Sequence, residues 1–475
     1  MNTAEKIYQK KRMTHWDMVS DFKENPNRIG SFYHQLLAHY YRFLVPPGLK
    51  VLELGCGHGD LLADLKPSVG AGLDFSANML RTASKKHPNL FFVQADAHEI
   101  PLKDTFDVII LSDLVNDLRD VQILLEKLHP LCHKGTRVIL NFYNNMWRIP
   151  LSVIKLLKLG AMTLEQNWFS PEDMRNLLHL SDFEVIKYSP LILFPLKVPF
   201  LSEMLNRYLV RLWPVHWFAL TSFMVARPVR QPEKTYSPSV SVIVPARNES
   251  GNIEDIIRRI PVMGEKTEII FAEGHSQDNT FETIEKLIPR YPEKSCRLFR
   301  QKGKGKGDAV RLGFEKAEGD ILMILDADMT VPPGDLPRFY HAIASGKGEF
   351  VNGVRLVYPM EQDSMRFLNM VGNKFFSLAF SWLLGQSIKD TLCGTKVLWK
   401  KDYEMIAGNR YYFGEFDPFG DFDLLFGAAK LNFRIVEIPI RYRARTYGDT
   451  NIERWKHGWL LLKMVLFAAK RIKFI

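Results

Sequence analysis

Short apolar runs alternate with helical patterns along most of this chain, beginning near residue 50. Apolar runs of about four to eight residues bounded by turn-forming residues are typical of buried strands. Because strands that alternate with helices form βαβ units, the pattern predicts an α/β architecture with mainly parallel sheets. Residues 1–48 lie before the alternation and are expected to be helical. In the first half the expected strands are 51–54, 70–74, 90–93, 106–111, 137–141, 183–188 and 219–226.

A polar, proline-containing stretch from Arg227 to Pro238 interrupts the alternation and has no apolar periodicity. Such a composition is typical of a linker. The alternation then resumes, and it becomes less regular from Glu349 onward. We therefore predict a first domain at 1–228, a linker at 229–238, a second domain at 239–450 and a tail at 451–475. In the second domain the expected strands are 240–245, 267–272, 296–299 and 320–326, and the expected helices are 251–260, 278–289 and 306–317.

The overall composition is that of an ordinary globular protein, but the chain carries an excess of basic residues. The 475 residues are 46% hydrophobic and 24% charged, which is ordinary for a globular protein. Lysine and arginine exceed the acidic residues by 63 − 53 = 10, and this excess suits anionic partners such as phosphates or an acidic membrane. The four cysteines form no CxxC pair and residues 1–12 are polar. We therefore expect a cytoplasmic chain without disulfides, a zinc site or a secretory signal.

The basic excess is concentrated at the end of the chain, where residues 441–475 contain nine Lys/Arg and two acids among Trp, Leu and Phe. Lys463 and Lys470 interrupt the apolar run, so a membrane-spanning helix is not expected. A basic amphipathic helix on the cytoplasmic face of a membrane is the favoured interpretation, because long basic side chains reach headgroups while aromatics lie at their depth. A helix packed on its own domain is the alternative.

A glycine-rich turn follows the first expected strand and precedes a helix, with the sequence Glu53-Leu-Gly-Cys-Gly-His-Gly59. Glycines permit positive φ and a close approach of ligand to backbone. Asp74 ends the next strand, where a carboxylate can accept hydrogen bonds from ribose hydroxyls. Asp96 and Ala97 follow the third strand, where a base could lie. The three elements share the carboxyl edge of the sheet, which is where such sheets bind ligands.

An NAD site is the obvious competitor, but its usual GxGxxG spacing differs from the GxGxG spacing in this turn. Over residues 30–228 the chain resembles the class I S-adenosylmethionine-dependent methyltransferases, which have a Rossmann-like sheet. The resemblance implies that Glu53, Gly55 and Gly57 line the methionine part of S-adenosylmethionine. It implies that Asp74 holds the ribose, and that Asp96 with Ala97 holds the adenine.

Methyl transfer needs an oriented acceptor and often a general base. The resemblance places Asp113 at the active-site edge after the fourth strand, and we take it as the catalytic candidate. Asn116, Asp117, Asn141 and Tyr143 also lie near strand ends. Helix capping or loop hydrogen bonding is the alternative for each of these side chains. Cys56, inside the turn, is interpreted as a small packing residue.

A second candidate site lies at the end of the apolar run 320–325, where Asp326 and Asp328 follow. Residues i and i+2 of an extended strand point the same way, so the two carboxylates are expected to converge on one divalent cation, Mg²⁺ or Mn²⁺. Such a cation can neutralise a diphosphate leaving group. An acidic surface turn is the alternative, because a DxD sequence also occurs by chance.

The surroundings of this pair resemble the family 2 glycosyltransferases of GT-A fold, over about residues 238–450. The resemblance implies that Asp326 and Asp328 bind the metal and the sugar diphosphate. It also implies that four further residues frame the nucleotide sugar: Pro245, Glu249, Glu273 and Lys306. The family usually has two adjacent acids where this chain has Glu273-Gly274, which is a departure that bears on base recognition.

Within that family the chain looks most like the polyprenyl-phosphate (dolichol-phosphate mannose type) synthases. Alternating Arg441, Arg443 and Arg445 would share one strand face and bind the acceptor phosphate, with a solvated edge strand as the alternative. The family ends this stretch with Gly-Ser-Lys, whereas here Thr450-Asn451 replaces Ser-Lys. A hydroxyl acceptor would need a base, for which Asp421 or Asp423 is our candidate.

These expectations combine into a bifunctional enzyme of cell-envelope glycan or glycolipid synthesis. A nucleotide sugar would donate to a polyprenyl phosphate or lipid-linked glycan at the membrane surface, and S-adenosylmethionine would donate a methyl group. Methylation of the same glycan is a further hypothesis, which rests on the fusion of the two domains in one chain. One alternative is a glycosyltransferase whose first domain binds cofactor or acts as a scaffold without turnover. A nucleic-acid substrate is not expected, because the basic residues gather with Trp and Leu in the tail.

Overall fold

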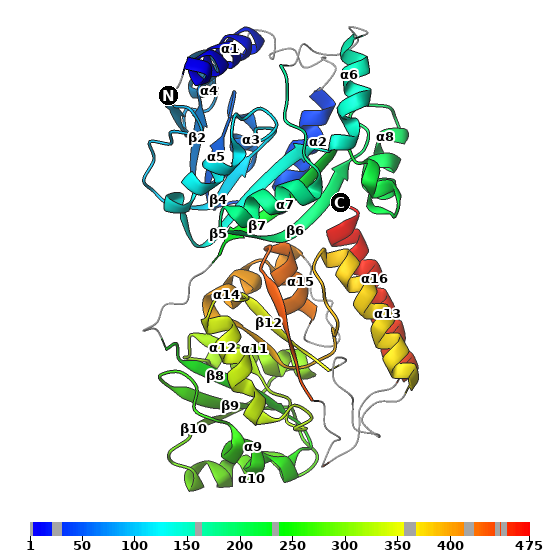
Figure 1. The fold of residues 1–475 in the computed structure, drawn as a ribbon. Coiled ribbons are helices and arrows are strands. Elements are labelled where there is room, and N and C mark those ends of the chain that lie inside the picture. Colours follow the sequence, from blue (N-terminus) through cyan, green and yellow to red (C-terminus); the bar gives the residue numbers. More distant parts are fainter. Residues whose placement is uncertain are drawn as a thin grey trace. The chain divides into compact units, whose positions relative to one another are not determined.

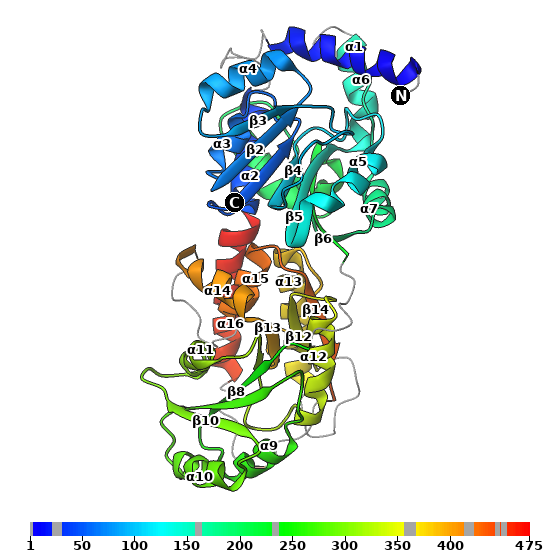
Figure 2. The ribbon, with the colours of Figure 1, turned by 90° about the vertical axis from the view of Figure 1, so that its left-hand side faces the viewer.

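The computed structural model describes residues 3–20, 31–156, 164–229, 237–355, 367–412, 422–441, 447 and 454–475. The chain divides into two compact units, one formed by residues 1–229 with Phe474 and the other by residues 230–473 with Ile475. The predicted linker at 229–238 lies mostly outside the described residues. Each unit contains a seven-stranded sheet with helices on both faces (Figure 1, Figure 2).

The first sheet has the strand order β3-β2-β1-β4-β5-β7-β6. Only β7 runs antiparallel to its neighbours β5 and β6. The order reverses between β1 and β4, and ligands bind beside such a reversal at the carboxyl ends of the strands. The predicted Rossmann-like sheet is therefore confirmed. The strands are β1 (Lys50–Leu54), β2 (Val69–Asp74), β3 (Phe91–Gln94), β4 (Phe106–Leu111), β5 (Cys132–Tyr143), β6 (Phe183–Ile192) and β7 (Thr221–Pro228).

The helical region before this sheet is amphipathic where it packs on the unit. In α2 the buried side chains Tyr33, Leu37, Tyr40, Tyr41 and Leu44 recur at helical spacing and form one apolar face. The helices of the unit are α1 (Thr3–Ser20), α2 (Ser31–Leu44), α3 (Asp60–Asp64), α4 (Ala77–Lys86), α5 (Val121–Lys127), α6 (Arg148–Leu156), α7 (Pro171–Leu180) and α8 (Leu201–Glu203).

The second sheet has the order β10-β9-β8-β11-β13-β12-β14, with β13 antiparallel to β11 and β12. Its central strands β8, β9 and β11 are mostly apolar and buried, as is typical of strands covered by helices on both faces. The predicted GT-A-like α/β unit is confirmed. The strands are β8 (Val240–Ala246), β9 (Thr267–Glu273), β10 (Ser295–Arg300), β11 (Ile321–Ile324), β12 (Phe350–Val354), β13 (Lys396–Trp399) and β14 (Ile435–Pro439).

Two of these strands end earlier than the sequence pattern predicts. The strand expected at 320–326 ends at Ile324, so Asp326 and Asp328 lie in the turn after it, where Met329 has a φ of 56°. The alternation argument for their shared direction therefore does not apply. Likewise β14 ends at Pro439, before Arg441, so Arg441 is not on the arginine strand that we expected.

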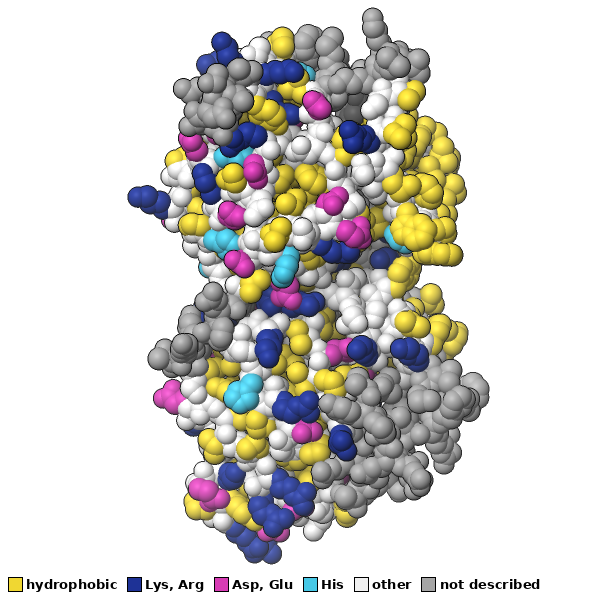
Figure 3. Space-filling model, viewed as in Figure 1, with side chains coloured by type: hydrophobic (Ala, Val, Ile, Leu, Met, Phe, Trp, Pro, Cys, Tyr) yellow, Lys and Arg dark blue, Asp and Glu magenta, His cyan; other side chains and the backbone are white. Residues whose placement is uncertain are grey.

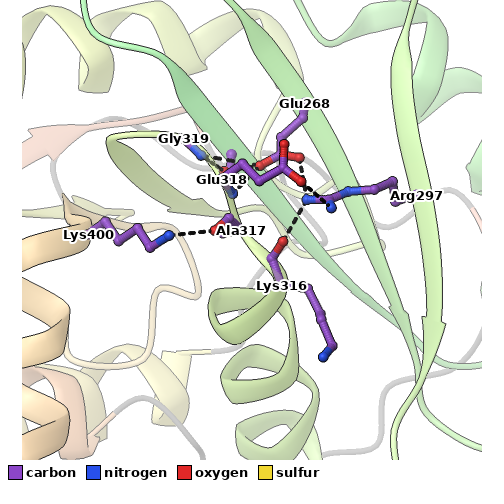
Figure 4. Close-up of polar contacts among 8 residues, drawn as sticks. Glu268, Arg297, Lys316, Ala317, Glu318, Gly319 and Lys400 are labelled. Carbon is purple, nitrogen blue, oxygen red and sulfur yellow. Dashed lines mark hydrogen bonds and ion pairs between the residues drawn. The ribbon is translucent and has the colours of Figure 1, made fainter.

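A buried ion pair fixes the start of β11 against the strands beside it (Figure 4). The Glu268 carboxylate receives hydrogen bonds from the Arg297 guanidinium at 2.6 Å and from the Glu318 backbone N–H at 2.7 Å. Arg297 also donates to the Lys316 carbonyl at 2.6 Å, and Lys400 donates to the Ala317 carbonyl at 2.8 Å. The end of α11 and the beginning of β11 are thus held in register, which positions the acidic turn that follows β11.

The tail forms helix α16, which packs against α13 within the second unit. Its buried side chains Leu461, Met464 and Ala468 follow one face, while Trp459 and Leu466 are exposed on another. In the described part of the chain no helix is long and apolar enough to cross a membrane. A membrane-surface role of the tail stays a prediction. The helices of this unit are α9 (Ile253–Arg259), α10 (Thr280–Leu287), α11 (Lys306–Lys316), α12 (Leu336–Ala344), α13 (Phe367–Leu384), α14 (Lys400–Gly408), α15 (Phe422–Lys430) and α16 (Arg454–Ala468).

Candidate functional sites

The glycine-rich turn of the first unit lies directly after β1. Gly55, Gly57 and Gly59 have φ values of 72°, 53° and 73°, which favour glycine. A Cβ at Gly59 would also lie 2.7 Å from the ring of Phe92, so this position has no room for a side chain. The turn therefore brings bare backbone to the carboxyl edge of the sheet, as a cofactor site there requires.

Asp74 connects this turn to the end of β2. One carboxylate oxygen accepts from the Gly57 N–H and the other from the Ser76 N–H, each at 2.9 Å. Ser76 then caps α4 by accepting from the Met79 N–H at 3.3 Å. A carboxylate oxygen can accept more than one hydrogen bond, so Asp74 is chemically suited to accept from ribose hydroxyls. The position expected from the sequence is thus reproduced, and the ribose role stays a prediction.

Glu53, which we expect at the methionine end of the cofactor site, is 3% exposed near the end of β1, and this role stays a prediction. Cys56 beside it is a packing residue, because a Cβ at Gly72 would lie 2.7 Å from its sulfur. Burial, followed by the charges of Glu53 and Asp74, raises the pKa of the Cys56 thiol well above its usual value. The thiol is therefore not a nucleophile at neutral pH.

The adenine end is closed by residues that the sequence pattern did not single out. Asp96 accepts from the Gln9 side chain of α1 at 2.7 Å and from the His98 backbone N–H at 2.7 Å. Burial acts to raise the pKa of Asp96, but hydrogen bonds from His98 and Gln9 outweigh it, so the pKa is lowered. Ala97 is buried next to it. The carboxylate therefore stays ionised at neutral pH.

Helix α1 also reaches the loop after β4. The Trp16 indole N–H donates to the Asp117 carboxylate at 2.8 Å, Arg12 forms an ion pair with the same carboxylate, and the Tyr8 hydroxyl donates to its backbone carbonyl. The sequence analysis treated residues 1–48 only as a helical region. Nothing in the periodicity of α1 indicates these contacts, because Asp117 lies more than a hundred residues further along the chain.

Asp113, the catalytic candidate of this unit, lies in a network of neutral donors. Its carboxylate accepts from the Tyr33 hydroxyl at 2.8 Å and from the Asn141 amide at 2.6 Å. The Tyr41 hydroxyl donates to the Asn141 oxygen at 2.7 Å. Burial, followed by the Asp113 charge, raises the pKa of Tyr33 well above its usual value. The Tyr33 hydroxyl therefore stays protonated at neutral pH and donates its hydrogen bond to the Asp113 carboxylate.

In the second unit, Asp326 faces the N-terminal end of α11. The Lys306 ammonium lies 2.7 Å from the Asp326 carboxylate. Asp328 accepts from the Thr330 hydroxyl at 2.8 Å and from its backbone N–H at 3.1 Å. A Cβ at Gly394 would lie 1.9 Å from an Asp326 oxygen. Gly394, in the loop before β13, therefore leaves the room that the Asp326 carboxylate occupies.

Three cationic side chains act on Asp326. Burial acts to raise its pKa, but Lys306, Lys396 and Arg355, in that order, outweigh burial and lower it. Lys396 is fully buried and donates to the Cys393 carbonyl at 2.6 Å. This concentration of positive charge suits a site for the phosphates of a nucleotide sugar.

Arg355 is held in turn by Asp390. The guanidinium donates to both oxygens of the Asp390 carboxylate, at 2.6 Å and 2.8 Å. Asp390 also accepts from the Leu392 N–H at 3.0 Å, which shapes the loop that leads to Gly394.

Asp326 and Asp328 are suitable ligands for Mg²⁺ or Mn²⁺. In the described part of the chain no group of three or more His, Cys, Asp or Glu residues could hold a metal. The protein thus offers two carboxylates, and phosphate oxygens of the substrate would complete the coordination, as is usual for Mg²⁺ in phosphate chemistry. The donor set fits such a cation, and metal dependence stays a prediction.

The nucleotide end of this site contains two buried acids. Glu273 is 1% exposed and accepts from the Ser276 N–H at 2.5 Å and from Arg300 at 3.3 Å. Glu249 is also buried and accepts from the Asn252 amide at 2.8 Å. Burial acts to raise the pKa of Glu273, but the hydrogen bonds from Ser276 and the charge of Arg300 outweigh burial and lower the pKa. Pro245 lies at the end of β8 beside them.

At Gly274, where the family usually has a second acid, no neighbouring residue occupies the position that a Cβ would take. A Cβ at Gly274 would meet its nearest atom, the Cβ of Arg247, at an ordinary distance of 3.5 Å. The second acid that the family usually has would therefore fit, and this chain lacks its charge.

The expected acceptor residues are only partly described. Asp423 accepts from the Arg410 guanidinium at 3.2 Å and lies 3.9 Å from Arg311. Its role as a base stays a prediction. Arg441 is exposed beyond the end of β14. Asp421, Arg443 and Arg445 lie outside the described residues.

Comparison with known proteins gives a separate match for each unit. The family model described as methyltransferase domain matches residues 27–188, and the model described as glycosyl transferase family 2 matches residues 241–414. The dolichol-phosphate mannosyltransferase of Pyrococcus furiosus is 30% identical over 246 residues, which cover 50% of this chain and 67% of that protein.

Two further relatives match over shorter stretches. The low-salt glycan biosynthesis hexosyltransferase Agl6 of Haloferax volcanii is 26% identical over 49% of this chain and 54% of that protein. The undecaprenyl-phosphate 4-deoxy-4-formamido-L-arabinose transferase of Pseudomonas aeruginosa is 29% identical over 22% of this chain and 33% of that protein. The chain thus spans between one third and two thirds of the length of these three relatives.

Solved structures match each unit at low scores. A putative methyltransferase of Haloferax volcanii in complex with the Trm112 activator gives a TM-score of 0.35 at 16% identity, over 45% of this chain and 98% of that chain. Glucosyl-3-phosphoglycerate synthase of Mycobacterium tuberculosis gives 0.36 at 19% identity, over 50% of this chain and 80% of that chain. The fold assignments rest instead on the strand orders of the two sheets.

Proposed function

Because the chain belongs to the family 2 glycosyltransferases in its second half and carries a methyltransferase domain in its first, we propose that it is a bifunctional enzyme of lipid-linked glycan synthesis. The second unit transfers a sugar with inversion from a nucleotide sugar to a polyprenyl phosphate or a lipid-linked glycan. The first unit methylates with S-adenosylmethionine. The enzyme works at the cytoplasmic face of a membrane, to which α16 contributes its exposed Trp459 and Leu466.

One observation supports the glycosyl-transfer proposal most strongly. The positive charges of Lys306, Lys396 and Arg355 all act on Asp326, which is two residues before Asp328 in the chain. A divalent cation held by the two carboxylates would supply charge neutralisation at the leaving diphosphate. Lys306, at the first turn of α11, adds its charge, and the backbone N–H groups of that turn favour an anion. A polyprenyl phosphate acceptor is already an anion and requires little base assistance. A sugar hydroxyl acceptor would instead use Asp421 or Asp423.

The methyl-transfer proposal rests on the backbone turn at Gly55–Gly59 together with Asp74 and Asp96. These residues would hold S-adenosylmethionine, with Glu53 at its methionine end. Asp113, oriented by Tyr33 and Asn141, would orient or deprotonate a hydroxyl acceptor. The sugar handled by the second unit is the methyl acceptor that we propose.

Sugar transfer from radiolabelled nucleotide sugars to a polyprenyl phosphate tests the second unit. We expect Asp326→Asn to lower the rate at least about a hundredfold, because it removes negative charge that holds the cation at the diphosphate. A chelator should abolish transfer, and Mg²⁺ or Mn²⁺ should restore it. Glu315→Gln, at an exposed position of α11, serves as the matched control and should leave the rate unchanged. Full transfer in chelator would refute the metal-dependent assignment.

Calorimetric titration with S-adenosylmethionine tests the first unit. Asp74→Ala should weaken binding, since it removes the ribose acceptor and the support of the glycine turn, whereas Asp104→Ala at an exposed position should not. If the unmodified chain binds no S-adenosylmethionine, the second half alone is the enzyme. Binding without methyl transfer to any glycan would favour a cofactor-binding module.

A further inference from the structure

The segment between β6 and β7, residues 193–218, presents an apolar surface that the proposed activities do not use. Figure 3 shows hydrophobic side chains gathered over α6 and α8 of the first unit. Phe200 is 91% exposed and Trp213 is 75% exposed, and Leu201, Trp217 and Phe218 are exposed as well. Large aromatic side chains left in water at this density mark an interaction surface rather than ordinary scatter.

Two buried polar side chains, Asn206 and Ser202, hold this segment while several of its large apolar side chains are exposed. Asn206 is 2% exposed, accepts from the backbone N–H groups of Leu193 and Phe194 at 2.9 Å and 2.8 Å, and donates to the Phe194 carbonyl at 2.7 Å. Ser202 is buried and hydrogen-bonds the backbone of Leu196 and Val198. Hydrogen bonds within the segment thus fix its backbone, and the backbone holds the apolar side chains in their exposed positions.

The start of α6 joins the same surface. The Trp147 indole N–H donates to the Phe218 carbonyl at 2.8 Å, and the Asn144 amide donates to the Trp217 carbonyl at 3.1 Å. Ile149, in the first turn of α6, is 75% exposed. Two chain segments more than fifty residues apart therefore contribute to one apolar face.

The charges around this face are basic. Lys197 and Arg148 are exposed, and the one acid within 193–218, Glu203, forms an ion pair with Arg207 at 2.8 Å. Tryptophan, tyrosine and phenylalanine at the water boundary with lysine and arginine beside them are typical of surfaces that lie in the headgroup region of a bilayer. Anionic lipid adds electrostatic attraction for each basic residue.

We infer that this surface seats the methyltransferase unit on an anionic lipid bilayer, with Phe200, Trp213 and Trp217 entering the headgroup region. The inference rests on the first unit alone. It goes beyond the proposed contact of α16, and it adds a second, independent membrane-docking surface on the same chain. A methyl acceptor at the bilayer surface would then be presented directly to this unit.

Environment-sensitive fluorescence at single cysteines of the full-length chain tests this inference. The dye is placed at position 200 through Phe200→Cys, at position 91 through Phe91→Cys, and at position 466 through Leu466→Cys. Phe91 is an exposed phenylalanine on β3 of the same unit, so it serves as the matched control. The native Cys56 and Cys393 are buried, and Cys132 and Cys296 are replaced by serine.

With vesicles containing phosphatidylglycerol, the dye at position 200 should shift to shorter wavelength and be quenched by brominated lipid, whereas the dye at position 91 should not change. Replacing Lys197 and Arg148 by glutamate should raise the lipid concentration needed for the half-maximal response by at least about tenfold. A response at position 466 with none at position 200 would overturn the inference and leave the proposed contact of α16 intact. No fluorescence change at position 200, together with no binding of the chain to vesicles, would also overturn the inference. That result would favour a protein partner for the surface.

Discussion

At the scale of single residues, the second site depends on a glycine as much as on its charged groups. Asp326 lies where Lys306, Lys396 and Arg355 lower its pKa, and Gly394 lies against its carboxylate. A side chain at position 394 would occupy the space of an Asp326 oxygen. The position of the Asp326 carboxylate therefore requires a glycine in the loop before β13.

Gly394→Ala should abolish sugar transfer with little loss of fold. The added Cβ would lie 1.9 Å from the Asp326 oxygen, so the carboxylate must turn away from its position beside Lys306. We expect transfer to fall at least about a hundredfold. Gly334→Ala is the matched control, because a Cβ there meets no atom within 4 Å. Equal activities of the two variants would show that Asp326 does not need its present position.

The Arg355–Asp390 pair contributes to stability in a pH-dependent way. Burial acts to raise the pKa of Asp390, but Arg355 outweighs burial and lowers it. The carboxylate therefore stabilises the fold above its usual pKa of about 4, and this contribution is lost as pH falls through its lowered native value. Asp390 is 1% exposed on its side chain, so the desolvated charge depends on its partner.

Arg355→Met should cost about 3–5 kcal/mol of unfolding free energy at neutral pH, because it leaves a buried carboxylate without its ion pair. Without Arg355 the pKa of Asp390 should rise above its usual value, so the difference from the unmodified chain should shrink on acidification. Urea unfolding at several pH values measures this. The double variant Arg355→Met/Asp390→Leu should regain part of the loss. A pH-independent difference would contradict the assignment.

At the scale of elements, α1 contacts two of the loops at the carboxyl edge of the first sheet. Its side chains Gln9 and Trp16 reach Asp96 and Asp117, which follow β3 and β4. A ligand held by Asp96 would therefore lie next to this helix. Because Gln9 of α1 contacts a carboxylate that we expect to bind the ligand, ligand binding should change the opening equilibrium of α1.

S-adenosylmethionine should slow amide hydrogen exchange in peptides from residues 8–18 of α1. The reason is that ordering of Asp96 by the ligand strengthens the contacts that close α1 over the site. Helix α7, which begins with its own capping box at Ser170, is the internal control and should not change. Protection of β1 and β2 without any change in α1 would argue against a covering role.

Most of the architecture was predictable from the apolar runs, because β1, β4 and β8 are mostly apolar and nearly every residue in them is buried. The glycine turn and the acidic pair were predictable because their chemistry is local. The contacts of α1 and the role of Gly394 were not, since they depend on side chains distant in sequence. The end of β11 at Ile324 was missed because the turn that contains Met329 has no marker such as glycine or proline.

At the scale of the whole molecule, one chain carries two sheets whose carboxyl edges hold different chemistry. The first edge offers backbone, Asp74 and Asp96, which suit a sulfonium cofactor without a metal. The second offers two carboxylates and a cationic surround, which suit a metal and a diphosphate. Their fusion in one chain is the reason to propose a shared product.

The most direct test of that claim is mass spectrometry of the lipid-linked product made by the full-length chain from a nucleotide sugar and S-adenosylmethionine. The unmodified chain should form a product that is heavier, by the mass of one methylene group, than the product of Asp74→Ala, while both form it in equal amounts. Asp326→Asn should form neither product. Identical products from the unmodified chain and Asp74→Ala would contradict the proposal that both units act on one glycan.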